Sequence, residues 1–279
     1  MFRSKLTSLG KFQTWHQYRM QHKLNNLRFW QLVKVKIQMN LKSEASKHQL
    51  NYIWWLLEPA LFIALYYVIF GVFLNARSEN FIAFLICGKI PFLWFSRSVS
   101  NASNSIMTGT GLMNQIDIPK LFFPLVVIGQ DLVKTFFVFM LMLSILWTMG
   151  YQPSLAWFAI IPVALMQLLF ISSLAIIFAS FVPFLPDLRF IVQTFTMLMM
   201  FASGIFYNPS QFLIPEHKVL FFLNPLAAAI DMYRDIIMEG LLPNWSQLTI
   251  LAIGCGLALL FAIFLIRKFD HNYPRLVLQ

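Results

Sequence analysis

Charged side chains inside apolar segments are the chemically most conspicuous residues of this chain. They are Glu58, Lys89, Arg97, Asp131 and Lys134. An ionised side chain at the centre of a bilayer costs roughly 2.5–3.5 kcal/mol on insertion scales, so such residues face a bundle interior or a wet cavity. Asp131 and Lys134 are three positions apart, which puts them on one helix face as an ion pair. Arg97 is expected to reach the inner headgroups. For Lys89, a substrate path and a structural place both stay open.

Groups for catalysis or metal binding do not cluster in the sequence. There is no Gly-x-x-x-x-Gly-Lys-Ser/Thr phosphate loop, and Gly109-Thr-Gly111 is too short for a nucleotide site. The five histidines are scattered, and Cys87 and Cys255 each lie in an apolar run, so neither a metal cluster nor a disulfide framework is indicated. We therefore expect that the chain itself is not an enzyme and that it holds no cofactor or metal.

The composition is typical of a membrane protein. Of the 279 residues, 59% are hydrophobic and 11% are charged, whereas soluble domains carry roughly 25% charged residues. The net charge is +10, and ten of the 21 Lys and Arg residues lie in residues 1–50 beside a single acid, Glu44. No nucleic-acid motif accompanies this charge, so the asymmetry indicates a cytosolic basic arm over residues 1–24 rather than nucleic-acid binding.

Hydropathy predicts an all-α integral membrane fold with six transmembrane helices in residues 52–268. Each apolar segment approaches the ~20 residues that cross ~30 Å of hydrocarbon. The expected spans are Ile53–Phe73, Phe81 to beyond Ser100, Phe122–Trp147, Trp157–Val182, Phe190–Tyr207 and Leu248–Ile266. Residues 1–24 contain no apolar run of signal-peptide length. With the N-terminus inside, six crossings also leave residues 269–279 as a cytosolic tail.

Residues 25–48 are predicted to form an amphipathic interface helix. Apolar residues from Leu27 to Leu41 recur at three- and four-residue spacing, and Lys34 and Gln38 occupy the other face. A basic helix with an aromatic residue, Trp30, on its apolar side is typical of the membrane interface.

Residues 208–243 are too polar and too interrupted by proline to form one span. We expect an outer re-entrant helical hairpin, because irregular backbone at membrane depth must be buried in protein or line a cavity. Its second half, Leu226–Glu239, is expected to be helical, with Pro225 near the first turn and Gly240 at the end.

Several strings in this order resemble the permease subunits of polysaccharide-exporting ABC transporters. The string Asn51-Tyr-Ile-Trp-Trp-Leu-Leu-Glu-Pro59 resembles the beginning of their first span. Gly111–Leu125 resembles the cytosolic connection between spans two and three, although Gln115 and Asp117 stand where a basic residue is usual. The hairpin after span five and the basic tail of the family are matched by Ser203–Pro209, Leu223–Leu226, Tyr233–Asp235 and Arg267–Asp270.

The resemblance implies a membrane subunit that works with a separate ATPase. Two copies of the chain would form a homodimer and would bind two copies of an ABC ATPase, which would hold Mg-ATP. The unit would move a lipid-linked polysaccharide of the O-antigen or lipopolysaccharide, capsule or teichoic-acid type, with O-antigen first among these. Export would run from the cytosol to the outer face of a bacterial plasma membrane, with both termini of the chain cytosolic. Membrane lipids are the other expected partners.

On this basis we expect three sets of functional residues. The coupling set, which would contact the ATPase through helix 25–48 and loop 109–120, comprises Trp30, Lys34, Gln115, Asp117, Pro119 and Lys120. The channel set, whose aromatic rings would stack on sugars unless they face lipid or the core, comprises Glu58, Tyr66, Tyr67, Phe70, Lys89, Phe206 and Tyr207. The gate set at the exit comprises Asn224, Pro225, Asp231, Arg234 and Asp235.

Three alternatives stay open at this point. An ABC permease for a drug, haem or lipid often carries a large extracellular domain between its first two spans, where this chain has only Leu74–Asn80. A membrane-embedded glycosyltransferase or acyltransferase would need clustered carboxylates or histidines. A non-catalytic assembly protein would need neither the buried charges nor the broken hairpin.

Overall fold

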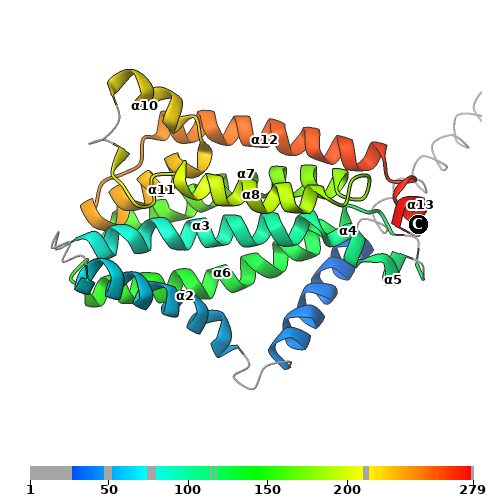
Figure 1. Ribbon diagram of the computed structural model, residues 1–279, viewed down its shortest axis with the longest axis horizontal. Coiled ribbons are helices and arrows are strands. Elements are labelled where there is room, and N and C mark those ends of the chain that lie inside the picture. Colours follow the sequence, from blue (N-terminus) through cyan, green and yellow to red (C-terminus); the bar gives the residue numbers. More distant parts are fainter. Residues whose placement is uncertain are drawn as a thin grey trace, which may run out of the picture.

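The computed structural model describes residues 27–46, 52–73, 80–113, 115–116, 118–209 and 214–277. The regular structure in these ranges is helical and includes no strand, as the hydropathy predicts. The long helices run nearly parallel along the longest axis of the molecule (Figure 1).

Four helices of the described residues are long and apolar enough to cross a membrane. They are α3 (Phe81–Ser103), α6 (Phe122–Thr148), α7 (Ile160–Phe181, preceded by the 3₁₀ turn Leu155–Ala159) and α12 (Trp245–Lys268). The two other expected spans are shorter: α2 (Ile53–Tyr66), which runs into the π-helix Tyr67–Phe73, and α8 (Leu188–Phe201). Four crossings are therefore identified, and the six-crossing topology stays a prediction.

Helix α3 is the centre of the bundle. It packs against α6, α7, α8 and α11 (Pro225–Arg234), while α12 packs along α7. Its buried side chains include Phe95, Ile86 and Val99, which belong to the larger of two apolar cores. Helix α12 instead exposes a row of large apolar residues such as Ile253 and Leu257, the pattern of a helix whose outer surface meets lipid.

Short helices cover the two ends of the bundle (Figure 1). The first end, here the α4–α5 end, carries α4 (Ser105–Thr108), α5 (Thr110–Met113) and α13 (Tyr273–Val277). The opposite, α11 end carries α10 (Pro215–Phe222), α11 and the π-helix Asp235–Glu239. Pro225 is the first residue of α11, and Gly240 follows the π-helix in a left-handed conformation. This helical segment therefore begins and ends at the predicted residues, and the re-entrant hairpin itself stays a prediction.

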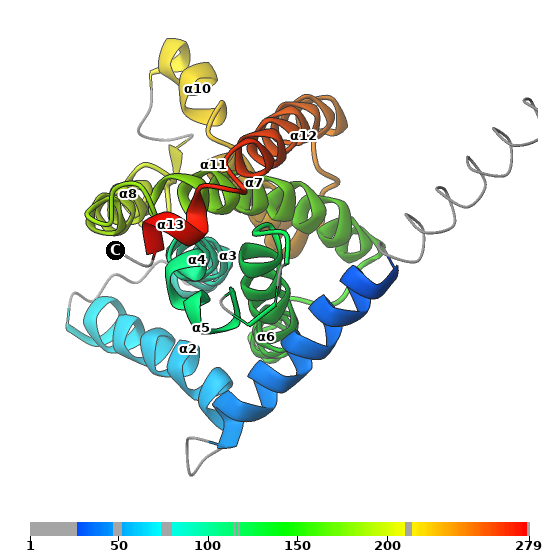
Figure 2. The same cartoon turned by 90° about the vertical axis from the view of Figure 1, so that its right-hand side faces the viewer.

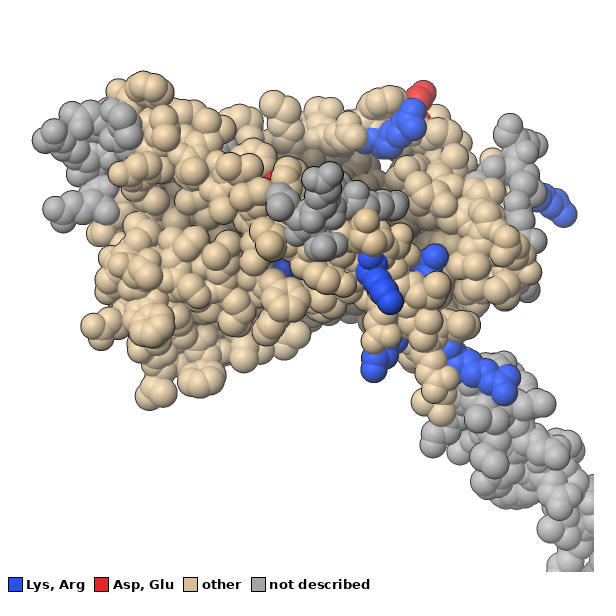
Figure 3. Space-filling model, turned by 90° about the horizontal axis from the view of Figure 1, so that it is seen from below, with Lys and Arg blue, Asp and Glu red and all other residues tan. Residues whose placement is uncertain are grey.

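The most N-terminal described helix, residues 27–46, lies obliquely across the outside of the bundle beside α6 (Figure 2). It approaches α6 closely because Gly129 has no side chain: a Cβ atom there would lie 2.5 Å from Ile37 Cδ1. Lys and Arg side chains gather toward the α4–α5 end on the face drawn in Figure 3, where the rest of the described surface is mostly uncharged.

Candidate functional site

Four of the five charged residues predicted within apolar segments come together in one layer of the bundle. Arg97 of α3 forms an ion pair with Glu58 of α2 at 2.5 Å, and Lys134 lies 3.8 Å from Asp131 on α6. Pro59, Arg97, Asp131 and Lys134 line one small cavity. The predicted Asp131–Lys134 pair is thus confirmed.

The fifth member of this layer was missed by sequence reasoning. Glu44 of helix 27–46 accepts hydrogen bonds from Lys134 Nζ at 2.7 Å and from the Gln130 side chain. Asn40, one turn earlier, donates to Gln130 Oε1 at 3.4 Å. The available signal was that Glu44 is the single acid among residues 1–50. We call Glu44, Glu58, Arg97, Asp131 and Lys134 the polar layer.

The polar layer joins helix 27–46 and α2 to the central helices. Four of its groups are partly exposed, with side-chain exposures of 14% for Lys134, 31% for Arg97, 35% for Glu44 and 42% for Glu58, whereas the Asp131 side chain is buried at 7%. Ion pairs with this access to solvent are worth about 0–1 kcal/mol each. The layer therefore positions helix 27–46 and α2 through contacts that are individually weak.

The charged residue outside this layer, Lys89, is 7% exposed and lies among three helices. Its Nζ lies 5.2 Å from the ring centre of Phe92 and 5.7 Å from that of Phe62 on α2. It also lies 3.4 Å from the sulfur of Met200 on α8. A cation over aromatic faces is stabilised by their quadrupoles. The buried Lys89 of α3 therefore contacts side chains of both α2 and α8.

Helices α2 and α8, on either side of Lys89, expose many of their large apolar side chains. Of the fourteen residues of α8 only Val192 and Thr196 are buried. In the channel set, Tyr67 is 51% exposed, whereas Tyr207 donates a hydrogen bond to the Phe201 carbonyl at 3.0 Å and Phe206 packs on the Phe201 ring. The side chains of Tyr66 and Phe70 lie outside the described residues.

In the gate set, Arg234 is a buried clamp. It is 6% exposed and donates to the carbonyls of Gly204 at 2.9 Å, Ile205 at 3.1 Å and Phe84 at 3.4 Å. Its guanidinium lies 3.4 Å from the centre of the Phe84 ring. Gly88 makes room for it, because a Cβ there would lie 2.8 Å from Arg234 Nη2.

Asn224 makes the second link between α11 and the turn after α8. Its side-chain oxygen accepts from the Leu226 amide at 3.0 Å and caps α11 ahead of Pro225, and its amide donates to the Ala202 carbonyl at 3.3 Å. Asp231 of α11 and Asp235, the first residue of the following π-helix, are half-buried.

A second polar chain at this end runs through the core. Fully buried Tyr233 donates to Gln167 Oε1 at 3.0 Å, and Gln167 donates to the Pro91 carbonyl at 2.8 Å. Paired buried polar groups specify one arrangement, because an unpaired one costs about 1–3 kcal/mol.

The coupling set is only partly at the surface. Trp30, Lys34, Gln115 and Pro119 are exposed. Lys120 is 4% exposed, and its Nζ lies 3.8 Å from Asp270, whose carboxylate also accepts the Lys120 backbone amide at 2.7 Å. Lys120 thus ties the end of loop 109–120 to the segment after α12. Asp117 lies outside the described residues.

The segment after α12 packs on the bundle. Tyr273 of α13 is buried, lies 5.8 Å from Phe184 between ring centres and donates to the Ser180 carbonyl at 3.2 Å. Burial raises the pKa of Tyr273 to about 12, so this hydroxyl stays protonated and keeps donating at neutral pH. Within the described residues there is no group of three or more His, Cys, Asp or Glu side chains that could hold a metal ion.

Comparison with known proteins identifies relatives along most of the chain. Residues 121–238, from α6 to the end of the α11 region, match the family described as ABC-2 type transporter. The O-antigen export system permease protein RfbA of Klebsiella pneumoniae is 27% identical over 248 residues, which are 88% of this chain and 95% of the relative. RfbA of Myxococcus xanthus is 29% identical over 77% of this chain and 84% of its own length. The polysialic acid transport protein KpsM of Escherichia coli is 24% identical over 84% of this chain and 92% of its own.

Proposed function

We propose, on the premise that this chain carries an ABC-2 transporter membrane domain, that it is the membrane subunit of an ATP-driven exporter of a lipid-linked polysaccharide. The substrate would be of the O-antigen or lipopolysaccharide type. The observation that carries this proposal is the similarity to an O-antigen export permease over 88% of this chain and 95% of the relative. The names of the relatives favour a polysaccharide over a drug, haem or simple lipid as cargo.

We place the α4–α5 end in the cytosol of a bacterial inner membrane, with six crossings and both termini inside. The basic side chains that gather toward this end (Figure 3) support that orientation through the positive-inside rule. The exposed apolar surfaces of α2 and α8 support a place in the bilayer or against a second copy. The polar layer then lies near the inner headgroups, where its partly exposed ion pairs reach water.

The ATPase would act on this cytosolic end. Two ATPase copies, each holding Mg-ATP, would contact the exposed Gln115 and Pro119 and the outer face of helix 27–46. Movement of that helix reaches α6 through Glu44 and Lys134. The buried position of Lys120 supports a structural role for it beneath the contact.

The polysaccharide would pass between two copies of the chain along α2 and α8. Both helices flank Lys89 and leave apolar and aromatic side chains such as Tyr67 unpacked in the single chain. A homodimer would cover part of this surface, and the rest would line the path. The α10–α11 hairpin would border the exit at the opposite membrane face, held on α3 by Arg234.

The test is co-purification of the tagged chain from native membranes, with an ATPase assay of the eluate. We expect a stoichiometric partner that carries a phosphate loop, with vanadate-sensitive activity. A chain that elutes without any ATPase, from membranes in which the chain is folded, would contradict the proposal.

A further inference from the structure

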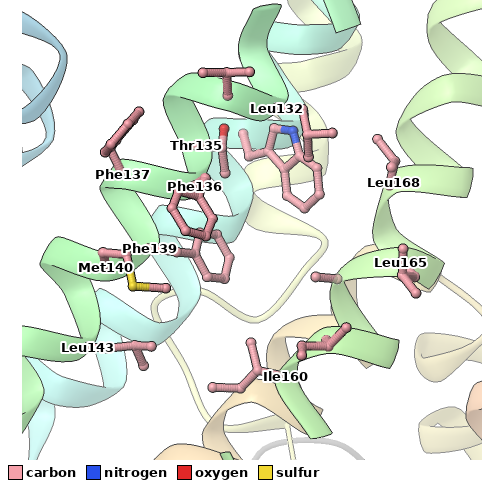
Figure 4. A pocket seen from close by; sticks show the side chains of 14 residues that line it. Leu132, Thr135, Phe136, Phe137, Phe139, Met140, Leu143, Ile160, Leu165 and Leu168 are labelled. Atoms are coloured by element: carbon pink, nitrogen blue, oxygen red, sulfur yellow. The ribbon is translucent and has the colours of Figure 1, made fainter. Parts of the chain in front are cut away.

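An apolar groove opens between α6 and α7. Its volume is about 520 Å³. In Figure 4, Phe136 and Met140 of α6 lie across the gap from Leu165 and Leu168 of α7. Both helices are candidate membrane spans, so the surrounding medium is hydrocarbon rather than water.

The groove continues toward helix 27–46. A second hollow of about 670 Å³ lies between that helix, α6 and α7, and it shares Leu132, Val133 and Leu168 with the first. Its lining changes in character, because Lys34 and Gln38 of helix 27–46 and Ser172 of α7 now contribute polar groups. We call this second hollow the Lys34 mouth. Together the two hollows form one path, apolar at the far end and cationic at the mouth.

Three features indicate that the path is built to be occupied. The close contact of Ile37 with Gly129 holds helix 27–46 against α6 and so sets one wall of the mouth. Trp30, 59% exposed, lines the mouth, and tryptophan favours the headgroup level of a bilayer. Trp94, 4% exposed, lines the apolar groove, and its indole N–H has no acceptor among the described residues.

We propose that this path binds one anionic phospholipid of the inner leaflet, with an acyl chain between α6 and α7 and its phosphate at Lys34. The occupant is a lipid because the groove opens within two candidate membrane spans. It is anionic because the mouth presents an exposed lysine and no carboxylate among its lining residues. Basic pockets between membrane helices on the cytoplasmic side are suited to acidic headgroups. The orientation rests on the proposed topology.

The experiment uses the full chain in phosphatidylcholine vesicles with a trace of phosphatidylglycerol that carries a photoreactive group in one acyl chain. Crosslinked peptides are mapped by mass spectrometry. We expect the α6–α7 groove to be labelled about fivefold more than Ile253 and Leu257 of α12, although these two side chains are more exposed than the groove lining, since one surface lysine changes the binding of an acidic lipid by about that factor. A phosphatidylcholine probe should label both regions alike.

Two variants and a matched control complete the test. Lys34→Gln should remove the preference for phosphatidylglycerol, and Ala164→Trp should fill the groove and lower labelling by both probes. Lys36→Gln, on the same helix but outside the lining, should leave the labelling unchanged. Equal labelling of the groove and α12, equal labelling of the groove by both probes, or an unchanged preference in Lys34→Gln would each overturn the proposal. A groove that stays unlabelled by both probes would also overturn it, whether or not a second copy covers the groove. Because no ATPase is present, none of these outcomes bears on the exporter proposal.

Discussion

Two regions of the molecule use cationic side chains to hold helices together, and they do so in opposite ways. At the α11 end, the Arg234 guanidinium is buried against three backbone carbonyls and one aromatic face. In the polar layer, Lys134 and Arg97 pair with carboxylates that remain 35% and 42% exposed. Removing a buried donor lowers stability strongly, because the buried carbonyls are left without a hydrogen bond. An exposed ion pair contributes little, because water can replace either partner.

In the proposed exporter, this difference would give the two regions different roles. Helix α11 is fastened to α3 by Arg234 and to the turn after α8 by Asn224, so we expect it to move with those helices. Helix 27–46 is attached through groups that can exchange partners. The region that would contact the ATPase, helix 27–46, is therefore the one held by partly exposed ion pairs.

The largest effect is expected from Arg234→Met. The change leaves the carbonyls of Phe84, Gly204 and Ile205 without their donor. This should lower the free energy of unfolding by roughly 3–6 kcal/mol in total. Thermal unfolding of the purified chain in detergent should show a large drop in midpoint. Arg275→Met, at an exposed site on α13, is the control and should unfold like the parent. A midpoint for Arg234→Met within the error of the parent would show that the clamp does not hold this end.

Gly88→Ala should have the second largest effect and lower the free energy of unfolding by about 1–3 kcal/mol. The reason is that the new methyl group meets Arg234 Nη2 in a packed interior. Adding Gly88→Ala to Arg234→Met should cost less than it does in the parent, since the two residues share one space. The control is Gly254→Ala on α12, where the added Cβ has no neighbour within 4 Å. If the shifts in unfolding midpoint of Gly88→Ala and Arg234→Met simply added in the double variant, the two side chains would not occupy one space.

In the polar layer, Glu44→Gln should change stability by about 1 kcal/mol or less, since the ion pair to Lys134 is partly exposed. Its effect should be on coupling: partner ATPase stimulation by the chain should fall while the unfolding midpoint barely moves. Ser43→Gln, one position earlier on an exposed site, controls for the helix surface. If Glu44→Gln stimulated the ATPase fully, the ion pair between Glu44 and Lys134 would have no part in coupling.

The smallest effect on stability is expected from Gln115→Ala, within about 0.5 kcal/mol, because the side chain is exposed. If the coupling contact lies at this loop, ATPase stimulation should nonetheless decrease. Lys120→Met should show the reverse pattern, with a lower unfolding midpoint from the loss of the Asp270 contact. Stimulation that depends on Lys120 and not on Gln115 would reverse the assignment within the coupling set.

Much of the fold follows from the sequence because membrane spans depend on local apolar length. The boundaries of α6 and the start and end of α11 with its π-helix were predicted within a few residues, from hydropathy and from Pro225 and Gly240. The Asp131–Lys134 pair was predictable too, since helical spacing alone brings the two residues together.

The rest of the site depends on contacts that no local pattern encodes. Glu44 and Lys134 are ninety positions apart and meet only when helix 27–46 lies on α6. The partners of Arg234 are backbone carbonyls, which leave no trace in side-chain spacing. Lys120 was expected at a partner surface because a charged loop residue is usually exposed, and its contact with Asp270 was not visible from the sequence.

The most direct test of the exporter assignment is transport in sealed inverted membrane vesicles that contain the chain and its co-purified ATPase. The lipid-linked polysaccharide is supplied outside, and its appearance in the lumen is followed by protection from a glycosidase that cannot cross the membrane. We predict ATP-dependent, vanadate-sensitive protection of the polysaccharide that is lost when the chain is omitted. Protection that proceeds equally without the chain, or a complete complex that hydrolyses ATP and protects no polysaccharide of any tested type, would contradict it.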